Sequence, residues 1–140
     1  MDSMDTLSPH ERSKRMSLVR GTNTKPEMIV RRMIHGMGYR YRLYVSKLPG
    51  RPDIVFSKRR KIILVHGCFW HRHPKVTCKL ARMPKSKLNF WRPKLERNRQ
   101  RDIQAERQLK RNGWRILVIW ECEIRSANLA DRVNRFLEAD

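Results

Sequence analysis

A chain of 140 residues with 33 Lys and Arg against 13 Asp and Glu carries a formal net charge of +20. That length fits one domain with a hydrophobic core of its own, and the clustering of its apolar residues into segments excludes a disordered tail. The charge makes nucleic acid the first expected partner and an anionic membrane surface a weaker one, because the sequence has no basic amphipathic helix with a strongly apolar face.

The first part of the chain is predicted to be an arm followed by a helix. Residues 1–23 are polar and basic with little periodicity, so we expect an arm or a short first helix outside the core. The segment T-K-P-E then opens a helix, with Thr24 as its cap and Glu27 at the reciprocal position of a capping box. Apolar residues at helical spacing follow, and Gly36 and Gly38 end the helix.

Three strands and a long loop are predicted next. Alternation from Tyr39 to Val45 indicates a half-buried strand, and the apolar runs at 54–56 and 61–65 should pair as a hairpin across a basic turn. The loop at 67–86 is rich in His, Pro, Lys and Cys, and it is too long to lack a function in a small domain.

The last part of the chain is predicted to be helix, strand and helix. A highly charged helical pattern runs from about Lys87, or from Pro93 if the proline marks its start, to the N-G stop signal at 112–113. The run W-R-I-L-V-I-W at 114–120 predicts a strand that is central in a sheet covered on both faces, and a helix follows at about 129–137. The order α-β-β-β-α-β-α indicates one α/β domain with a mixed central sheet flanked by helices.

The cysteines indicate a metal site. Three cysteines far apart, no signal peptide and no segment near the ~20 apolar residues of a membrane span predict a cytosolic chain. Cys68, His73 and Cys78 lie within one loop, and Cys122 follows a distant strand. This set suits tetrahedral zinc, which would join the polar loop to that strand. The spacing is not that of a zinc knuckle, so thiols in the core or loop beside an unrelated histidine are the alternative.

A carboxylate and two histidines are candidates for phosphodiester chemistry. Many nucleases hold Mg²⁺ with an acid on one strand and a polar group on its neighbour, in the pattern Pro-Asp followed by (Asp/Glu)-x-Lys. Pro-Asp is present at Asp53, but the second half is missing, and the alternative is an Asp in a turn. His66 and His71 could supply a general base or stabilise charge, or they could pack in the loop.

Other candidate residues also have structural alternatives. Asp102 lies among arginines on the charged helix and could be their ion-pair partner, as Glu27 could belong only to the capping box. The adjacent aromatics Phe69 and Trp70 suit stacking or wedging between bases, although at least one of them is expected in the core. Met16, in S-K-R-M, could wedge likewise.

Together these stretches resemble the very-short-patch repair (Vsr) endonuclease family, the strand-specific nickases for T:G mismatches. The matching segments are S-K-R-M, T-K-P-E, L-P-G-R-P-D, H-G-C-F-W-H, F-W-R-P-K-L-E-R-N-R-Q-R-D and G-W-R-I-L-V-I-W-E-C, in this order over residues 12–125. The resemblance implies a restriction-endonuclease-like fold with a structural zinc, an endonuclease domain at 24–140 and a DNA-contacting arm at 1–23. The expected reaction is a Mg²⁺-dependent nick 5′ of the thymine that arises from deaminated 5-methylcytosine.

The resemblance also assigns roles to individual residues. Asp53 would bind Mg²⁺ directly, together with the backbone carbonyl of Val65, and His66 and Asp102 would act through metal-bound waters. His71 would lie beside the scissile phosphate, as a general base or a phosphate stabiliser. Glu27 would support His71 or the arm. Zinc would be held by Cys68, His73, Cys78 and Cys122, and the wedge would consist of Met16, Phe69 and Trp70. The family has Thr where Val65 stands and a shorter spacing between His73 and Cys78; a backbone ligand tolerates the first change.

The expected setting is the bacterial cytoplasm, associated with the nucleoid. The resemblance implies a monomer acting on double-stranded DNA with a T:G mismatch, with a functional link to a cytosine-5 DNA methyltransferase and to mismatch-repair proteins. Two alternatives remain open from the sequence. One is a restriction or defence endonuclease of the same fold without mismatch specificity, and the other is a non-catalytic, zinc-stabilised nucleic-acid-binding protein.

Overall fold

The computed structural model describes residues 23–75, 77–83 and 87–140. Its helices are α2 (Lys25–Gly36), α3 (Leu88–Arg111) and α4 (Leu129–Glu138), its strands are β1 (Arg42–Leu43), β2 (Ile54–Phe56), β3 (Lys61–His66) and β4 (Arg115–Trp120), and its short 3-10 turns are η2 (Lys79–Ala81) and η3 (Glu121–Glu123). The predicted order α-β-β-β-α-β-α is confirmed from α2 onward. Apart from Asn23, the arm predicted at 1–23, and with it Met16, lies outside the described residues.

The four strands form one mixed sheet in the order β1-β2-β3-β4. Strand β2 is antiparallel to both β1 and β3, with Ile54 opposite Ile63, so the predicted hairpin is confirmed. Strands β3 and β4 are parallel, and helix α3 lies in the crossover that parallel neighbours require. Because His66 and Trp120 are the last partners in this register, the segments that follow both strands meet at the same edge.

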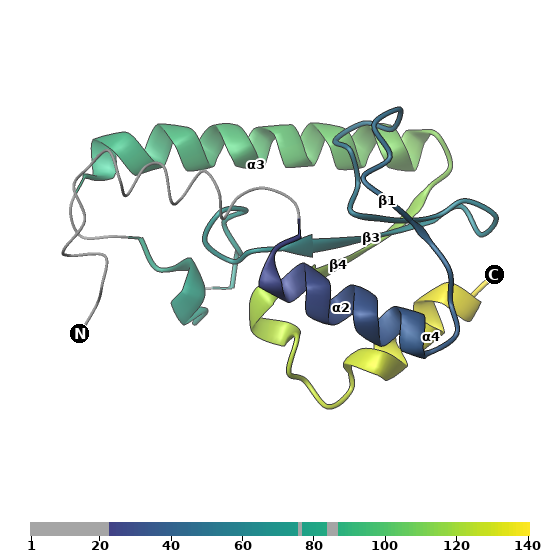
Figure 1. Ribbon diagram of the computed structural model, residues 1–140. Coiled ribbons are helices and arrows are strands. Elements are labelled where there is room, and N and C mark those ends of the chain that lie inside the picture. The colour runs from purple at the N-terminus through teal and green to yellow at the C-terminus, as the bar shows by residue number, and fades with distance from the viewer. Residues whose placement is uncertain (1–22, 76, 84–86) are drawn as a thin grey trace.

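Helices cover both faces of the sheet, as predicted. Helices α2 and α4 lie on one face and the long helix α3 on the other (Figure 1). On the first face Val30 and Val133 pack in one buried cluster with Ile63, and on the second face Leu109 packs with Ile62. None of the helices in the described part of the chain combines the length and the apolar composition that a membrane span requires.

Strand β4 was expected at the centre of the sheet and that prediction is wrong: it lies at the edge of the four described strands, and β3 is central beside it. Its apolar composition has another cause. Ile116 packs against the α3 cluster, whereas Leu117 and Ile119 pack against the cluster formed with α2 and α4. An edge strand between two helical layers is therefore apolar on both faces, just as a central strand would be.

The first strand is much shorter than the alternation from Tyr39 to Val45 predicted. Only β1 pairs, and it ends where Tyr44 adopts a left-handed backbone conformation with φ +48°. The alternation instead reflects Tyr39 and Tyr41, which both pack edge-on against Phe56, with centroids 6.4 and 6.0 Å apart.

Helix α3 begins at Leu88, the earlier of the two predicted starts. Pro93 lies inside the helix, in its second turn. The missing N–H of this proline leaves only the carbonyl of Asn89, four residues before it, without its helical donor. The backbone N–H of Trp91 still bonds to the Lys87 carbonyl at 3.1 Å, so the turn before the proline is helical.

Candidate active site and metal centre

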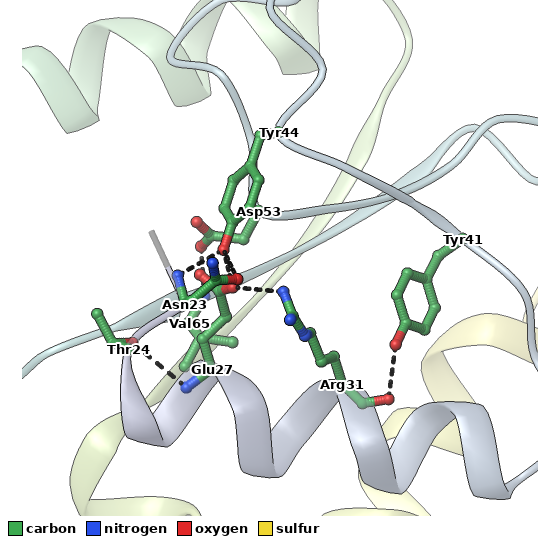
Figure 2. Close-up of polar contacts among 8 residues, drawn as sticks. All are labelled: Asn23, Thr24, Glu27, Arg31, Tyr41, Tyr44, Asp53 and Val65. Atoms are coloured by element: carbon green, nitrogen blue, oxygen red, sulfur yellow. Dashed lines mark hydrogen bonds and ion pairs between the residues drawn. The ribbon is translucent and has the colours of Figure 1, made fainter. Parts of the chain in front are cut away.

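The hairpin of β2 and β3 places Asp53 beside Val65. Asp53 directly precedes β2, and its Oδ2 accepts a hydrogen bond of 2.9 Å from the backbone N–H of Val65, near the end of β3 (Figure 2). The turn before Asp53 packs closely against helix α3. Gly50 in this turn has φ +74°, and a Cβ added to it would lie 2.6 Å from the Cβ of Ala105. Asp53 is thereby fixed between the sheet and α3.

The environment of Asp53 favours a cation partner. Burial raises the pKa of Asp53 from 3.8 to about 6, against the hydrogen bond from the Val65 amide, which lowers it. The nearby charges of Glu27 and Asp102 contribute to this rise in the pKa. A bound cation would stabilise the ionised carboxylate and lower its pKa, which offsets the cost of ionising a buried acid.

Three side chains from different elements form a compact group next to it. His66 ends β3, His71 follows in the loop and Asp102 projects from α3; their candidate ligand atoms all lie within 4.8 Å of one another. The two imidazoles are stacked with centroids 4.0 Å apart at 7°, and Nδ1 of His71 lies 2.5 Å from Oδ2 of Asp102. When His71 donates its Nδ1 proton to this carboxylate, Nε2 is left as an acceptor that can take up a proton.

His66 is a neutral imidazole at physiological pH. Burial lowers its pKa to about 3, with a smaller contribution from His71. Its Nδ1 is buried and has no hydrogen-bond partner in the described residues. Buried polar atoms are rarely left in this state, so this nitrogen fits a partner that arrives with substrate or metal.

Glu27 is buried at the start of α2, with an exposed fraction of 3%. The Oγ1 of Thr24 accepts the Glu27 N–H at 3.4 Å, which is one half of the predicted capping box. The side chain of Glu27 does not return to the cap. Its Oε2 accepts from Arg31 at 3.2 Å and from the hydroxyl of Tyr44 (Figure 2). Among the described residues the Glu27 carboxylate makes no hydrogen bond with His71.

A single cleft collects the predicted catalytic residues. Its volume is about 760 Å³, and its walls include Glu27, Asp53, His66, His71 and Asp102. Phe69 and Trp70 line the same cleft. The acids, the imidazoles and the aromatic residues that the sequence proposed separately therefore face one space.

The four predicted zinc ligands also lie together. Candidate ligand atoms of Cys68, His73, Cys78 and Cys122 are all within 4.8 Å of one another, a set of three sulfurs and one nitrogen that suits a tetrahedral metal. Burial raises the pKa of the Cys68 thiol, so a thiolate at that position needs a cation beside it. The sequence did not point to Trp120, whose ring stacks on His73 with centroids 4.3 Å apart and meets His66 edge-on.

The two aromatic residues predicted as a wedge pack against helix α3. Trp70 is 9% exposed and lies in a small cluster with Trp91 and Leu95 from the start of α3. Phe69 is half-buried and contacts both tryptophans edge-on, with centroids 5.3 Å apart in each case. The sequence did not single out Trp91, although the adjacent F-W pair at 90–91 repeats the F-W pair at 69–70.

An acidic residue at the start of one strand, a histidine at the end of its neighbour, a second histidine in the following loop and an aspartate on the helix across the cleft could together hold a divalent cation and accept a proton beside a phosphodiester. Residues 4–77 match the family model described as DNA mismatch endonuclease Vsr. The chain thus belongs to the Vsr family of DNA mismatch endonucleases, which confirms the resemblance seen in the sequence.

Relatives of known name agree with this assignment. The chain is 50% identical over 120 residues, 86% of each chain, to the "Type II nicking enzyme V.XorIIP" of Xanthomonas oryzae pv. oryzae. It is 37% identical over 134 residues, 95% of this chain and 94% of the other, to the "Type II nicking enzyme V.NmeAIP" of Neisseria meningitidis. Over 114 residues, 81% of this chain and 71% of the other, it is 38% identical to the "DNA mismatch endonuclease Vsr" of Escherichia coli.

Proposed function

We propose that this endonuclease nicks one strand of duplex DNA on the 5′ side of the thymine in a T:G mismatch. The Vsr family model and the relatives named as nicking and mismatch enzymes support the reaction class. The observation that carries the proposal is the Asp53 carboxylate, held by the Val65 amide in the same cleft as His66, His71 and Asp102. The nick would leave a 3′-hydroxyl and a 5′-phosphate.

The catalytic cation of the proposal is Mg²⁺. The Asp53 carboxylate and the Val65 carbonyl would hold it, since hard oxygen donors are its preferred ligands. His66 and Asp102 would act through metal-bound waters, a role that fits the unpartnered buried nitrogen of His66. When bound, the ion would stabilise negative charge on the phosphate and on the leaving oxygen.

His71 is the general base of the proposal. Its Nε2 would take a proton from the attacking water as the water oxygen bonds to phosphorus and the bond from phosphorus to O3′ breaks. The Asp102 carboxylate, 2.5 Å from Nδ1, would stabilise the imidazolium that forms. The buried Glu27 would support this site from the start of α2.

A structural zinc is the second metal of the proposal. Cys68, His73 and Cys78 from the loop and Cys122 from η3, just after β4, would be its ligands, as the grouping of their donor atoms supports. The ion would tie the polar segment at 67–83 to the sheet. It would also fix the neighbouring residues Phe69 and Trp70 relative to the active site.

Mismatch selection would come from a wedge of Phe69, Trp70 and Met16 that enters the base stack. A mismatched pair costs less to unstack than a matched one, so the wedge would favour T:G sites energetically. Entry of Trp70 would require its cluster with Trp91 to open. The net charge of +20 and the basic arm at 1–23 would bind the DNA backbone.

The cellular setting of the proposal is the bacterial cytoplasm. The protein would act there as a monomer alongside a cytosine-5 DNA methyltransferase and mismatch-repair proteins. A T:G pair formed by deamination of 5-methylcytosine would be its substrate.

Strand-specific nicking of end-labelled duplexes tests the function. A panel of T:G duplexes with varied flanks, plus matched T:A and C:G controls, should be nicked only 5′ of the mismatched thymine, only with Mg²⁺, and not by Asp53→Ala. Equal cutting of matched duplexes would instead support a restriction or defence endonuclease of the same fold. Identical behaviour of wild type and Asp53→Ala would support a non-catalytic nucleic-acid-binding protein.

A further inference from the structure

Tyr44 connects the two carboxylates that enter the cleft from different layers of the fold. Its backbone N–H donates to the carbonyl of Asp53 at 3.3 Å, which extends the pairing of β1 and β2 by one bond. Its hydroxyl donates to Oε2 of Glu27 and accepts the backbone N–H of Asn23 at 2.7 Å. Figure 2 shows the Tyr44 ring extending from the chain after β1 to the start of α2, with Asp53 and Val65 beside it.

The backbone of Tyr44 is held in an unfavourable conformation. At φ +48° it occupies the left-handed region, which residues with bulky side chains rarely adopt. This conformation ends β1 and directs the ring toward α2. The Arg51 guanidinium lies over the Tyr44 ring, 5.4 Å from its centroid. The turn that carries Asp53 therefore also packs on Tyr44. Unfavourable backbone conformations of this kind concentrate at functional sites.

The bond from Tyr44 is the contact that fixes Glu27 relative to the sheet. The other partner of Glu27, Arg31, lies four residues along the same helix, so that pair moves with α2 and does not locate the carboxylate relative to Asp53. Tyr44 belongs to the segment between β1 and β2 and bonds to Asp53 itself. Tyr44 is not part of the cleft wall, whereas both Glu27 and Asp53 are.

We propose that Tyr44 is a positioning residue, whose hydroxyl holds the Glu27 carboxylate beside Asp53 so that two negative charges together attract the divalent cation. The inference rests on the proposed Mg²⁺-dependent nuclease and assigns cation affinity, not proton transfer, to the contact between Tyr44 and Glu27. Without the hydroxyl, the Glu27 carboxylate keeps only Arg31 among its described partners and can turn along the helix, away from Asp53.

Tyr44→Phe removes the hydroxyl and keeps the ring. Binding of Mn²⁺ to the zinc-loaded, DNA-free protein, followed by the paramagnetic resonance signal of the free ion, should weaken on the order of tenfold, as expected for losing a hydrogen bond to a charged group. The Mg²⁺ concentration for half-maximal nicking should rise by a similar factor, while the rate at saturating Mg²⁺ stays within about threefold of wild type.

The chain supplies a matched control in Tyr41. Its hydroxyl donates to the backbone carbonyl of Arg31 at 2.8 Å, so it also joins the β1 segment to α2, but without touching a carboxylate (Figure 2). Tyr41→Phe makes the same chemical change and should leave Mn²⁺ binding within about twofold of wild type. Equal effects of Tyr41→Phe and Tyr44→Phe on the cation would overturn the inference.

A double-mutant cycle separates positioning from general support of the fold. Glu27→Gln should weaken Mn²⁺ binding by itself, and adding Tyr44→Phe should then change it by less than about twofold, because the hydroxyl acts through Glu27. Independent, multiplying effects would overturn the inference. If Tyr44→Phe folds poorly, Glu27→Gln alone carries the test, and unchanged Mn²⁺ affinity in that variant would be decisive against it.

The outcomes also distinguish this inference from the proposed function. Suppose that the protein nicks no duplex, but that Asp53→Ala abolishes Mn²⁺ binding and Tyr44→Phe weakens it. This result would contradict the proposed function and support the role of Tyr44. Mismatch-specific nicking with the same Mn²⁺ affinity in Tyr44→Phe and wild type would do the reverse.

Discussion

Asp102 on helix α3 lies 2.5 Å from Nδ1 of His71, whose ring is stacked on His66 at the end of β3. The long crossover helix thus supplies the carboxylate that orients an imidazole of the neighbouring loop. This geometry favours His71 as a proton acceptor at Nε2 over a histidine that only packs in the loop. It also gives Asp102 a histidine partner, where the sequence alone allowed an ion pair with a nearby arginine.

We therefore expect His71→Gln to slow nicking of a T:G duplex by roughly 10²- to 10⁴-fold, the usual contribution of a general base. Asp102→Asn should cause a smaller loss, because the imidazole remains but is no longer stabilised when charged. Single-turnover rates at saturating Mg²⁺ would measure both effects. Glu96→Gln is the control, since Glu96 is an exposed acid on the same helix that bonds only to Gln100 among the described residues. Rates in His71→Gln close to those of the control would remove His71 from the mechanism.

Removal of the metal from the Cys/His group should destabilise the fold. The three cysteines of the chain all belong to this group, so chelation of the proposed zinc would remove the metal link between the segment at 67–83 and Cys122, which follows β4. We expect the melting temperature to fall by roughly 10 °C, since structural zinc contributes several kcal/mol to folding. Differential scanning fluorimetry with and without a chelator, and metal analysis by mass spectrometry, would measure stability and stoichiometry.

Single-ligand variants locate that metal. His73→Asn should lose zinc, whereas His35→Asn should keep it, because the His35 side chain is exposed on α2. Cys78→Ser is the most informative change, since Cys78 departs from the family spacing. Full zinc content in that variant would show that Cys78 is not a ligand.

The pKa of Asp53 gives a stability difference that depends on pH. Because folding raises this pKa from 3.8 to about 6, ionisation of Asp53 costs stability; the cost is fully present above pH 6 and vanishes below pH 4. In metal-free buffer Asp53→Asn should therefore be more stable than wild type at pH 7, by about 3 kcal/mol, and the difference should shrink as pH falls through 6 toward 4. Urea denaturation at pH 7 and pH 4.5 would measure it.

Added Mg²⁺ should reverse the order of these two proteins at pH 7. The ion would bind the ionised carboxylate of the folded state and so would stabilise only the wild type. Identical stability of wild type and Asp53→Asn at both pH values would show that the carboxyl is not perturbed by its surroundings.

The sequence predicted the parts of this site that depend on strand ends and missed those that depend on packing between layers. Asp53 and the strand that leads to His66 could be placed together because a hairpin brings the start of one strand to the end of the next, whereas Val65 as a ligand came from the family resemblance. The grouping of Cys122 with the loop ligands was predicted from their residue types and from the family resemblance, although the parallel pairing of β3 and β4 that brings them together is not specified by local patterns. Tyr44 and Trp120 were missed because each acts through a contact between segments far apart in the chain. The edge position of β4 was missed because burial between two helical layers makes an edge strand as apolar as a central one.

A substitution at Gly50 tests whether the contact between this turn and α3 fixes the position of Asp53. Gly50→Ala adds a Cβ that would stand 2.6 Å from the Cβ of Ala105, at a backbone φ of +74° that favours glycine. The turn must then shift away from α3, so we expect a loss of roughly 1–3 kcal/mol in the free energy of unfolding and a drop in nicking rate. Gly50→Ala with Ala105→Gly removes the clash but not the backbone strain, and it should recover part of both losses. Ala105→Gly alone is the control, because it shows the cost of a helical glycine, about 1 kcal/mol. If the double variant is no better than Gly50→Ala, contact with α3 does not place Asp53, and the requirement at Gly50 is purely one of backbone conformation.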